Sequence, residues 1–302
     1  MPNLNHRLAR CCKGLSLLLL VAAFTVKAQL LSDIKALSDI SMQGRETGTA
    51  GAAMAAGYIS QRYAGLQLAA FMPEYLHPFS YGRNRVGTNL AGWIKGCRWP
   101  QSFIVVTAHY DHLGRLGSKI FHGADDNASG VAAMLELADR LSGSCPSYSY
   151  IFVATDAEEK GLYGSKAFVA DPPVPLHSIV LNLNLDMISR PDRHGALYLT
   201  GAKRYPELVS LLAGQPLRIR FLSARGPPRS AREPGRHNWH NVSDHGAFHR
   251  AGIPYLFFGG QDHPDYHTPE DTWHNIRQDF LDAAMEAIWQ TVLWLELQPP
   301  KP

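Results

Sequence analysis

The stretch FIVVTAHYDH, residues 103–112, decides how this chain of 302 residues is expected to fold. Its first six residues form an unbroken apolar run, which is typical of a strand buried on both faces of a parallel sheet. Ionisable residues follow at once, beginning with His109. The pattern therefore predicts a central strand whose carboxyl end carries functional side chains.

Similar apolar runs recur along the chain and are predicted as strands: YIFVAT (150–155), IVLNLNL (179–185), PYLFF (254–258) and the partly alternating VGTNLAGWIK (86–95). Stretches with helical periodicity lie between and around them, at 31–66 (interrupted at 44–51), 128–141, 162–170, 206–212 and 280–297. Alternation of strands and helices favours an α/β fold. We expect a three-layer sandwich with a mainly parallel central mixed sheet flanked by helices.

Five polar clusters stand out: AHYDH (108–112), GADDNASG (123–130), DAEEKG (156–161), NLDM (184–187) and DYHTPED (265–271). Each alone has a plain structural explanation, such as a helix cap or a solvated turn. Together they bring many carboxylates and histidines to one edge of one sheet. Such crowding is costly unless cations neutralise the charge, so the clusters indicate a metal site.

The donor set contains imidazole and carboxylate but no thiolate, which suits zinc, with manganese or cobalt as alternatives. Two ions need a carboxylate that can bridge them, and Asp126 is the natural candidate because it lies centrally and at the start of a helix. His109 with Asp186 would complete one site, and His267 with Glu159 the other. The sequence therefore predicts two zinc ions per chain.

Three further residues are predicted to act in catalysis. Glu158 stands beside a ligand without being used as one, so it is the best general base for a metal-bound water. Asp111 follows His109 by two residues and is expected to fix the orientation of its ring through the other ring nitrogen. Tyr266 precedes His267 and is expected to donate a hydrogen bond to a developing oxyanion.

These motifs resemble those of the co-catalytic zinc aminopeptidases, the family of bacterial leucyl aminopeptidase and glutamate carboxypeptidase, with glutaminyl cyclases as distant relatives. The resemblance runs from about Gly44 to Thr272. It covers His-x-Asp, Asp-Asn-x-Ser-Gly, Glu-Glu-x-Gly-x-x-Gly-Ser, Leu-Asp-Met and Tyr-His-x-x-x-Asp, in that order. It implies the same bridging residue, base and ligands as the charge argument, and a peptide or protein as substrate.

The stretch SDHGAF (243–248) also resembles a segment of the family near the substrate pocket, which makes Asp244 a candidate substrate-binding residue. An equally good reading is a helix N-cap at Ser243. Two other functions remain open: a glutaminyl-peptide cyclotransferase on the same fold, and a binding protein without metal. The intact Glu-Glu-x-Gly-Leu-x-Gly-Ser motif disfavours the first, and the complete ligand set disfavours the second.

The amino-terminal 28 residues differ from the rest. Arg7, Arg10 and Lys13 precede an apolar run at 15–26, and small residues lie three and one positions before a cleavage point after Ala28. This predicts a secretory signal peptide over 1–28 and a single catalytic domain over 29–302. Because the run is short for a bilayer, we expect no stable membrane anchor after cleavage and a periplasmic or extracellular location.

Removing that segment leaves 25 basic against 26 acidic residues, so the mature chain is close to neutral. A nucleic-acid partner is therefore not expected. Two cysteines remain, Cys97 and Cys145, each just before a predicted strand. Export permits a disulfide between them, and two free thiols are the alternative.

Overall fold

The computed structural model describes residues 29–222, 225–228 and 236–300. Its main sheet is mixed and has the order β1–β3–β7–β4–β8–β13–β9–β10, with β2 also paired to β3. The strands are β1 (Ala69–Ala70), β2 (Leu76–Tyr81), β3 (Arg85–Ile94), β4 (Trp99–His109), β7 (Tyr148–Thr155), β8 (Ile179–Asp186), β9 (Ala196–Thr200), β10 (Arg218–Leu222) and β13 (Tyr255–Gly259). Small two-stranded pairs are β5 (Arg115–Leu116) with β6 (Lys119–Ile120), and β11 (Arg225–Pro228) with β12 (Arg236–Asn238).

Four neighbouring strands, β7, β4, β8 and β13, run parallel in the centre of the sheet. Residues 103–109 of β4 and all of β7 are buried, as expected for strands covered on both faces. His109 pairs with Thr155, and Asp186 pairs with Gly259. The carboxyl ends of the four strands therefore lie side by side at one edge.

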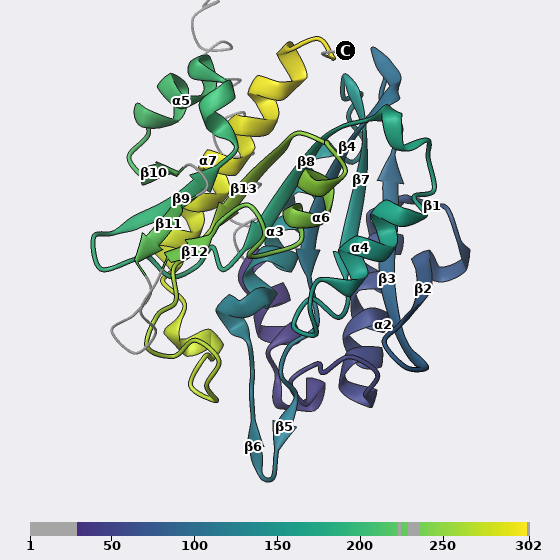
Figure 1. The fold of residues 1–302 in the computed structure, drawn as a ribbon, viewed down its shortest axis with the longest axis vertical. Helices are drawn as coiled ribbons and strands as arrows, with labels where there is room; N and C mark the ends of the chain where they lie inside the picture. The colour runs from purple at the N-terminus through teal and green to yellow at the C-terminus, as the bar shows by residue number, and fades with distance from the viewer. Residues whose placement is uncertain (1–28, 223–224, 229–235, 301–302) are drawn as a thin grey trace, which may run out of the picture.

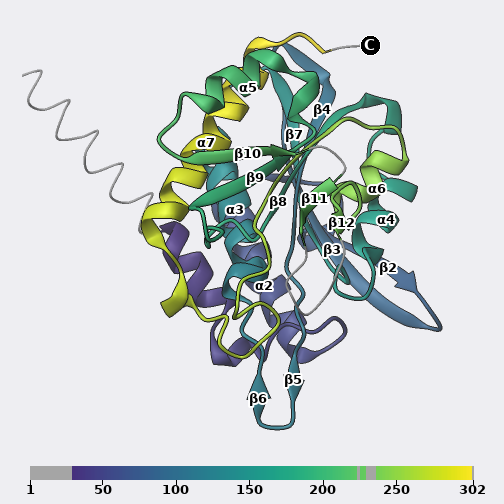
Figure 2. The same cartoon turned by 60° about the vertical axis from the view of Figure 1, so that its left-hand side comes forward.

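Helices cover both faces of the sheet (Figures 1 and 2). One face carries α2 (Ala50–Gly65), α3 (Gly130–Leu141), α5 (Pro206–Ala213) and α7 (Gln278–Leu297), which share the larger apolar core. The other face carries α4 (Tyr163–Ala170) and α6 (His245–Arg250), which pack on a smaller core around Phe168 and Phe248. The predicted three-layer α/β sandwich is confirmed.

The sequence patterns missed the edges of the sheet. Strand β10 alternates arginine with apolar residues, and β2 contains histidine, proline and serine, so neither forms an apolar run. Strand β9, ALYLT, is as long as β13 and fully buried, yet it is not among the predicted strands. The signal peptide expected over 1–28 lies outside the described residues. Within the part that the structure describes, no helix is long and apolar enough to cross a membrane.

Cys97 and Cys145 form a disulfide. The two residues precede β4 and β7, which are parallel neighbours, and their Cα atoms are 5.5 Å apart. The backbone N–H of Cys97 also donates to Pro146. Of the two alternatives left by the sequence, the structure contains the bridge, at the amino ends of the central strands.

Candidate metal centre and active site

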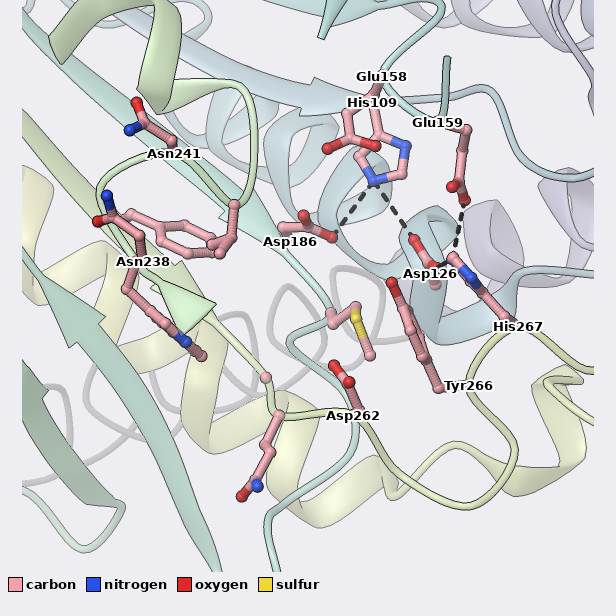
Figure 3. Close-up of a pocket in the computed structure, with 16 residues that line it drawn as sticks. His109, Asp126, Glu158, Glu159, Asp186, Asn238, Asn241, Asp262, Tyr266 and His267 are labelled. Atoms are coloured by element: carbon pink, nitrogen blue, oxygen red, sulfur yellow. Dashed lines mark ion pairs between the residues drawn. The ribbon is translucent and has the colours of Figure 1, made fainter. Parts of the chain in front are cut away.

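The predicted ligands meet at the carboxyl ends of the central strands (Figure 3). His109 ends β4, Glu158 and Glu159 follow β7, and Asp186 ends β8. They border a cavity of about 400 Å³ that Asp126, Tyr266 and His267 also line. Segments far apart in the chain therefore converge on one pocket, as the sequence predicted.

His109 and Asp186 belong to the first group of candidate ligands. His109 Nε2 lies 3.3 Å from Asp186 Oδ1 and 3.4 Å from Asp126 Oδ1. The other ring nitrogen, Nδ1, lies 3.1 Å from the backbone oxygen of Asp111. With Nδ1 hydrogen-bonded to a carbonyl, Nε2 presents its lone pair to the group, which is the arrangement that a metal-binding histidine needs.

His267 and Glu159 belong to the second group. His267 Nε2 lies 3.1 Å from Asp126 Oδ2 and 3.3 Å from Glu159 Oε1. The two carboxylate oxygens of Asp126 thus face different histidines, Oδ1 toward His109 and Oδ2 toward His267. This is the geometry of a carboxylate that can bridge two cations.

His112 is a member of the second group that the sequence argument missed. Its Nδ1 lies 2.9 Å from Glu159 Oε1 and 3.8 Å from Asp126 Oδ2, and its side chain is fully buried. Donor atoms of His112, Asp126 and Glu159 all lie within 4.8 Å of one another, as do those of His109, Asp126 and Asp186. The available signal was its place in the same HYDH turn as His109.

The loop that presents Asp126 is fastened to the end of β8. Asn127 accepts hydrogen bonds from the backbone N–H groups of Gly130 (2.9 Å) and Met187 (3.2 Å) and donates to Leu185 (3.0 Å). A Cβ at Gly130 would lie 2.4 Å from both Asn127 Oδ1 and Leu185 O, so only glycine fits there. The motif Asp-Asn-x-Ser-Gly thus fixes the backbone beneath the bridging residue.

Asp271 holds the same loop from the other side. Its carboxylate accepts hydrogen bonds from the backbone N–H groups of Asp125 (3.0 Å) and Asp126 (3.1 Å). Asp271 is fully buried and lies four residues after His267. It therefore ties the segment that carries Tyr266 and His267 to the loop that carries Asp126.

Asp111 does not make the contact expected of it. Its carboxylate Oδ1 is 3.7 Å from His109 Nδ1, too far for a hydrogen bond, and the backbone oxygen of Asp111 takes that role instead. The carboxylate accepts from the backbone N–H groups of Glu158 (3.0 Å) and Glu159 (3.2 Å). Asp111 therefore positions the Glu-Glu turn, a contact that spacing along the chain could not reveal.

Comparison with known proteins agrees with this geometry. The model of peptidase family M28 matches residues 89–292, which is more than half of the chain. The chain belongs to peptidase family M28.

Curated proteins similar to this chain include aminopeptidase YwaD of Bacillus subtilis, 32% identical over 80% of this chain and 50% of that protein. The alkaline phosphatase isozyme conversion protein of Escherichia coli is 29% identical over 69% of this chain and 65% of its own length. The chain thus spans between about half and two thirds of these two relatives.

Solved structures show the same fold. A zinc aminopeptidase from Bacillus subtilis superposes with a TM-score of 0.69 at 19% identity, covering 91% of this chain and 96% of the other. Glutaminyl cyclase of Porphyromonas gingivalis gives a TM-score of 0.67 at 18% identity, covering 89% and 98%. At this identity the likeness concerns the fold, which both kinds of enzyme share.

The electrostatics of the M28 site favour positive charge at its centre. Burial alone would lower the pKa of His109, but Asp186, Glu158 and Asp126 raise it well above its usual value. The pKa of His267 is raised to about 10: Asp126 and Glu159 outweigh the effect of burial. Carboxylates around both rings thus create a field that stabilises cations.

The carboxylates respond in two opposite ways. Burial would raise the pKa of Asp126, but His109, His267 and His112 hold it well below its usual value, so the bridging candidate is ionised. Burial raises the pKa of Glu158 well above its usual range, and the charges of neighbouring carboxylates raise it further. Asp126 and Glu158 are thus neighbouring acids whose pKa values are shifted apart. Such pairs are typical of active sites in which one acid stays ionised and the other transfers a proton.

The residues present fit a pair of metal ions. Asp126 Oδ2, Asp186 Oδ1 and His267 Nε2 are buried atoms that make no hydrogen bond within the described part of the chain. Buried polar atoms are rarely left unpaired, because each costs about 1–3 kcal/mol. All three point into the cluster, where cations would satisfy them together.

Tyr266 stacks on the imidazole of His267, with ring centroids 3.8 Å apart. Burial, together with the charges of Asp126 and Glu159, raises the pKa of its hydroxyl well above the usual value. The hydroxyl therefore keeps its proton and can donate it in a hydrogen bond. In Figure 3 the ring lies beside His267 with its hydroxyl directed toward Asp126.

The rest of the pocket wall is formed by nine residues, of which Trp239 is buried: Met187, Asn238, Trp239, Asn241, Val242, Phe257, Gly260, Gln261 and Asp262. Residues 223–241 are rich in arginine, proline, glycine and histidine and lack periodicity, which predicts a long surface loop, and Asn238, Trp239 and Asn241 lie at its end. Residues 223–224 and 229–235 of that loop lie outside the described residues. The described end of the loop does border the pocket.

Asp244 is fully buried and accepts a hydrogen bond from the hydroxyl of Thr155. It is the residue before α6 but makes no side-chain cap, and Ser243 accepts from Asn184 (2.8 Å) instead of capping the helix. Asp244 does not line the cavity, and its charge is among those that raise the pKa of Glu158. This position suits a residue that influences the candidate base Glu158 rather than one that contacts substrate. The substrate-binding role of Asp244 stays a prediction.

Proposed function

We propose that this M28 peptidase is an aminopeptidase that uses two zinc ions bridged by Asp126. The observation that carries the proposal is the divided geometry of Asp126, whose two oxygens face two separate sets of ligands. His109 and Asp186 would hold one ion, and His267 and Glu159 the other. Zinc suits imidazole and carboxylate donors in sites that leave room for a water.

Zinc bound here would polarise the scissile carbonyl and lower the pKa of a water molecule. Glu158 lines the same cavity and is the acid whose pKa the site raises. It would take the proton of the attacking water and deliver it to the nitrogen of the leaving amine. Tyr266 would donate its hydroxyl proton in a hydrogen bond to the oxyanion that forms from the carbonyl oxygen.

The charge of the pocket favours a substrate with a free amino terminus. The described residues that line the cavity include no lysine or arginine, whereas five carboxylates do line it: Asp126, Glu158, Glu159, Asp186 and Asp262. A carboxypeptidase needs a cationic side chain to bind the terminal carboxylate of its substrate. Asp126, Glu159 and Asp186 are assigned to the metal ions, which leaves the carboxylates of Glu158 and Asp262 to meet an ammonium group.

Chromogenic aminoacyl substrates test the proposal. We expect cleavage of compounds with a free amino group, no cleavage of their amino-acetylated forms, loss of activity with a zinc chelator and recovery when zinc is restored. Equal cleavage of free and acetylated substrates would contradict the aminopeptidase assignment. Cyclisation of amino-terminal glutamine without peptide hydrolysis would establish the glutaminyl cyclotransferase alternative, whose fold is shared.

Export through the segment 1–28 is part of the same proposal. The test is the amino-terminal sequence of the protein recovered outside the cytoplasm after expression of the full chain. We expect it to begin at Gln29, and an intact Met1 on the recovered protein would contradict cleavage.

A further inference from the structure

The two ligand groups of the active site are unequal. Around the first, a single histidine, His109, faces Asp126 and Asp186. Around the second, two histidines, His112 and His267, face the same oxygens of Asp126 and Glu159. The second group therefore offers four donor side chains, whereas the first offers three.

The two histidines of the second group are held very differently. His112 has no exposed surface, and its backbone N–H donates to Arg45 O at 3.2 Å. Gly123 packs against its ring so closely that a Cβ there would lie 2.6 Å from His112 Cδ2. The side chain of His267 is 35% exposed, on the segment that also carries Tyr266. His112 is thus the fixed donor of the pair.

The polar contacts of the His112 ring lie at the ligand group, where its Nδ1 is 2.9 Å from Glu159 Oε1. Its Nε2 makes no hydrogen bond within the described residues, so its polar contacts are those of Nδ1 with the ligand group. A neutral imidazole protonated at Nδ1 would donate to Glu159 and leave the lone pair of its buried Nε2 without a donor, whereas one that turned its Nδ1 lone pair toward the two carboxylate oxygens would be repelled by them. A cation shared by the three groups removes that repulsion.

We propose that His112 is a ligand, through Nδ1, of the metal ion held by Glu159, so that this ion has four protein ligands: His112, Asp126, Glu159 and His267. Four protein ligands make a closed site, and three leave a position open for water or substrate. The Glu159 site is therefore the tight one, and the site of His109 and Asp186 is the open one. This inference rests on the proposed dinuclear function.

The test uses His112→Ala and His112→Asn in the full-length protein, with zinc affinity measured by competition against a chromogenic chelator. The wild type is expected to release its two ions in two separate steps. His112→Ala is expected to weaken the tighter step by more than the roughly 10- to 100-fold that loss of an outer-shell partner costs. The absorption spectrum of the Co²⁺-substituted protein is expected to change with it.

His112→Asn separates a ligand from a mere hydrogen-bond donor, because asparagine can place an N–H group near the position of Nδ1 but has no imidazole lone pair. We expect it to behave like His112→Ala. Restoration of both the tight step and the Co²⁺ spectrum by asparagine would overturn the proposal. His122→Asn is the matched control: its Nδ1 contacts Ser38 O at 2.8 Å, away from the ligands, and it should bind zinc like the wild type.

The outcomes also distinguish this inference from the function on which it rests. Two ions bound by His112→Ala as tightly as by the wild type would refute the role of His112 and leave the dinuclear site standing. One ion per chain in the wild type would refute the dinuclear site, and the loss or retention of that ion in His112→Ala would still decide whether His112 binds it. Thermal unfolding of the metal-free variants checks that they fold.

Discussion

The two ends of the central parallel strands differ in whether their buried polar atoms are hydrogen-bonded within the protein. At the amino ends, Cys97 and Cys145 are bridged, and Glu296 of α7 accepts hydrogen bonds from the backbone N–H of Ser147 and, at 2.7 Å, from the hydroxyl of Tyr150. At the carboxyl ends, buried oxygens and nitrogens of Asp126, Asp186 and His267 make no hydrogen bonds to the described residues.

This difference indicates which end of the sheet contributes mainly to stability and which contributes mainly to function. Polar atoms at the amino ends are paired within the protein, so changes there should alter the free energy of unfolding. The unpaired atoms of Asp126, Asp186 and His267 at the carboxyl ends face the ligand groups, so changes there should alter metal binding and turnover. Substitutions at the two ends of the strands should therefore separate effects on catalysis from effects on stability.

Glu158→Gln should have the largest effect. Glutamine keeps the shape of the side chain but cannot accept the proton of the attacking water, so we expect kcat to fall by about three orders of magnitude while zinc content stays the same. Steady-state kinetics and elemental analysis measure the two quantities. Glu296→Gln, at the opposite end of the strands, is the control and should keep kcat. Normal turnover in Glu158→Gln would remove this residue from the role of base.

Tyr266→Phe should come second. It removes one donor to the oxyanion without disturbing the stacking on His267, so we expect kcat to fall about 100-fold with little change in KM. Measurement of kcat and KM for one aminoacyl substrate, in the wild type and in Tyr266→Phe, tests this prediction. A rise in KM with unchanged kcat would mean that Tyr266 contacts the substrate in its ground state and not in the transition state.

Asp271→Asn should act on the metal rather than on the reaction. The amide can accept through only one oxygen and carries no charge, so the loop of Asp126 loses part of its anchor. We expect zinc affinity to fall about 10- to 100-fold, measured by chelator competition. Glu270→Gln, one residue away and exposed, is the matched control. Unchanged affinity in Asp271→Asn would show that the loop is held without it.

Replacing both Cys97 and Cys145 by serine should have the smallest effect on catalysis. We expect kcat and zinc content to stay at wild-type values, because the bridge lies at the amino ends of the strands. The free energy of unfolding should fall by roughly 2–4 kcal/mol, since the disulfide closes a long loop. Chemical denaturation measures the loss. A large fall in kcat of the folded variant would break the proposed division between the two ends.

Much of this arrangement could be predicted from the sequence. Long apolar runs such as 103–108 mark buried strands regardless of context, and the polar residues that follow them must gather where parallel strands end. Those two rules bring together His109, Glu159 and Asp186, whereas Asp126 is predicted from its place at a helix start and His267 from the need to complete the second ligand pair. The two rules fail at the edge strand β10, which alternates arginine with apolar residues and depends on its neighbour β9 for pairing.

Contacts within turns could not be predicted from the sequence. The direction of the Asp111 carboxylate depends on the dihedral angles of the HYDH turn, which direct it toward the backbone of Glu158 and Glu159 instead of His109. The same turn brings His112 onto the ligand group. Spacing along the chain says which residues are near one another, whereas the backbone path decides which atoms meet.

The zinc content of the purified wild type, beside that of Asp126→Ala, tests the central claim most directly. Asp126 is the residue on which both ligand groups converge, so we expect close to two zinc ions per chain in the wild type and less than one in the variant. A wild type that holds one ion or none, or a variant that keeps both, would contradict the bridged pair.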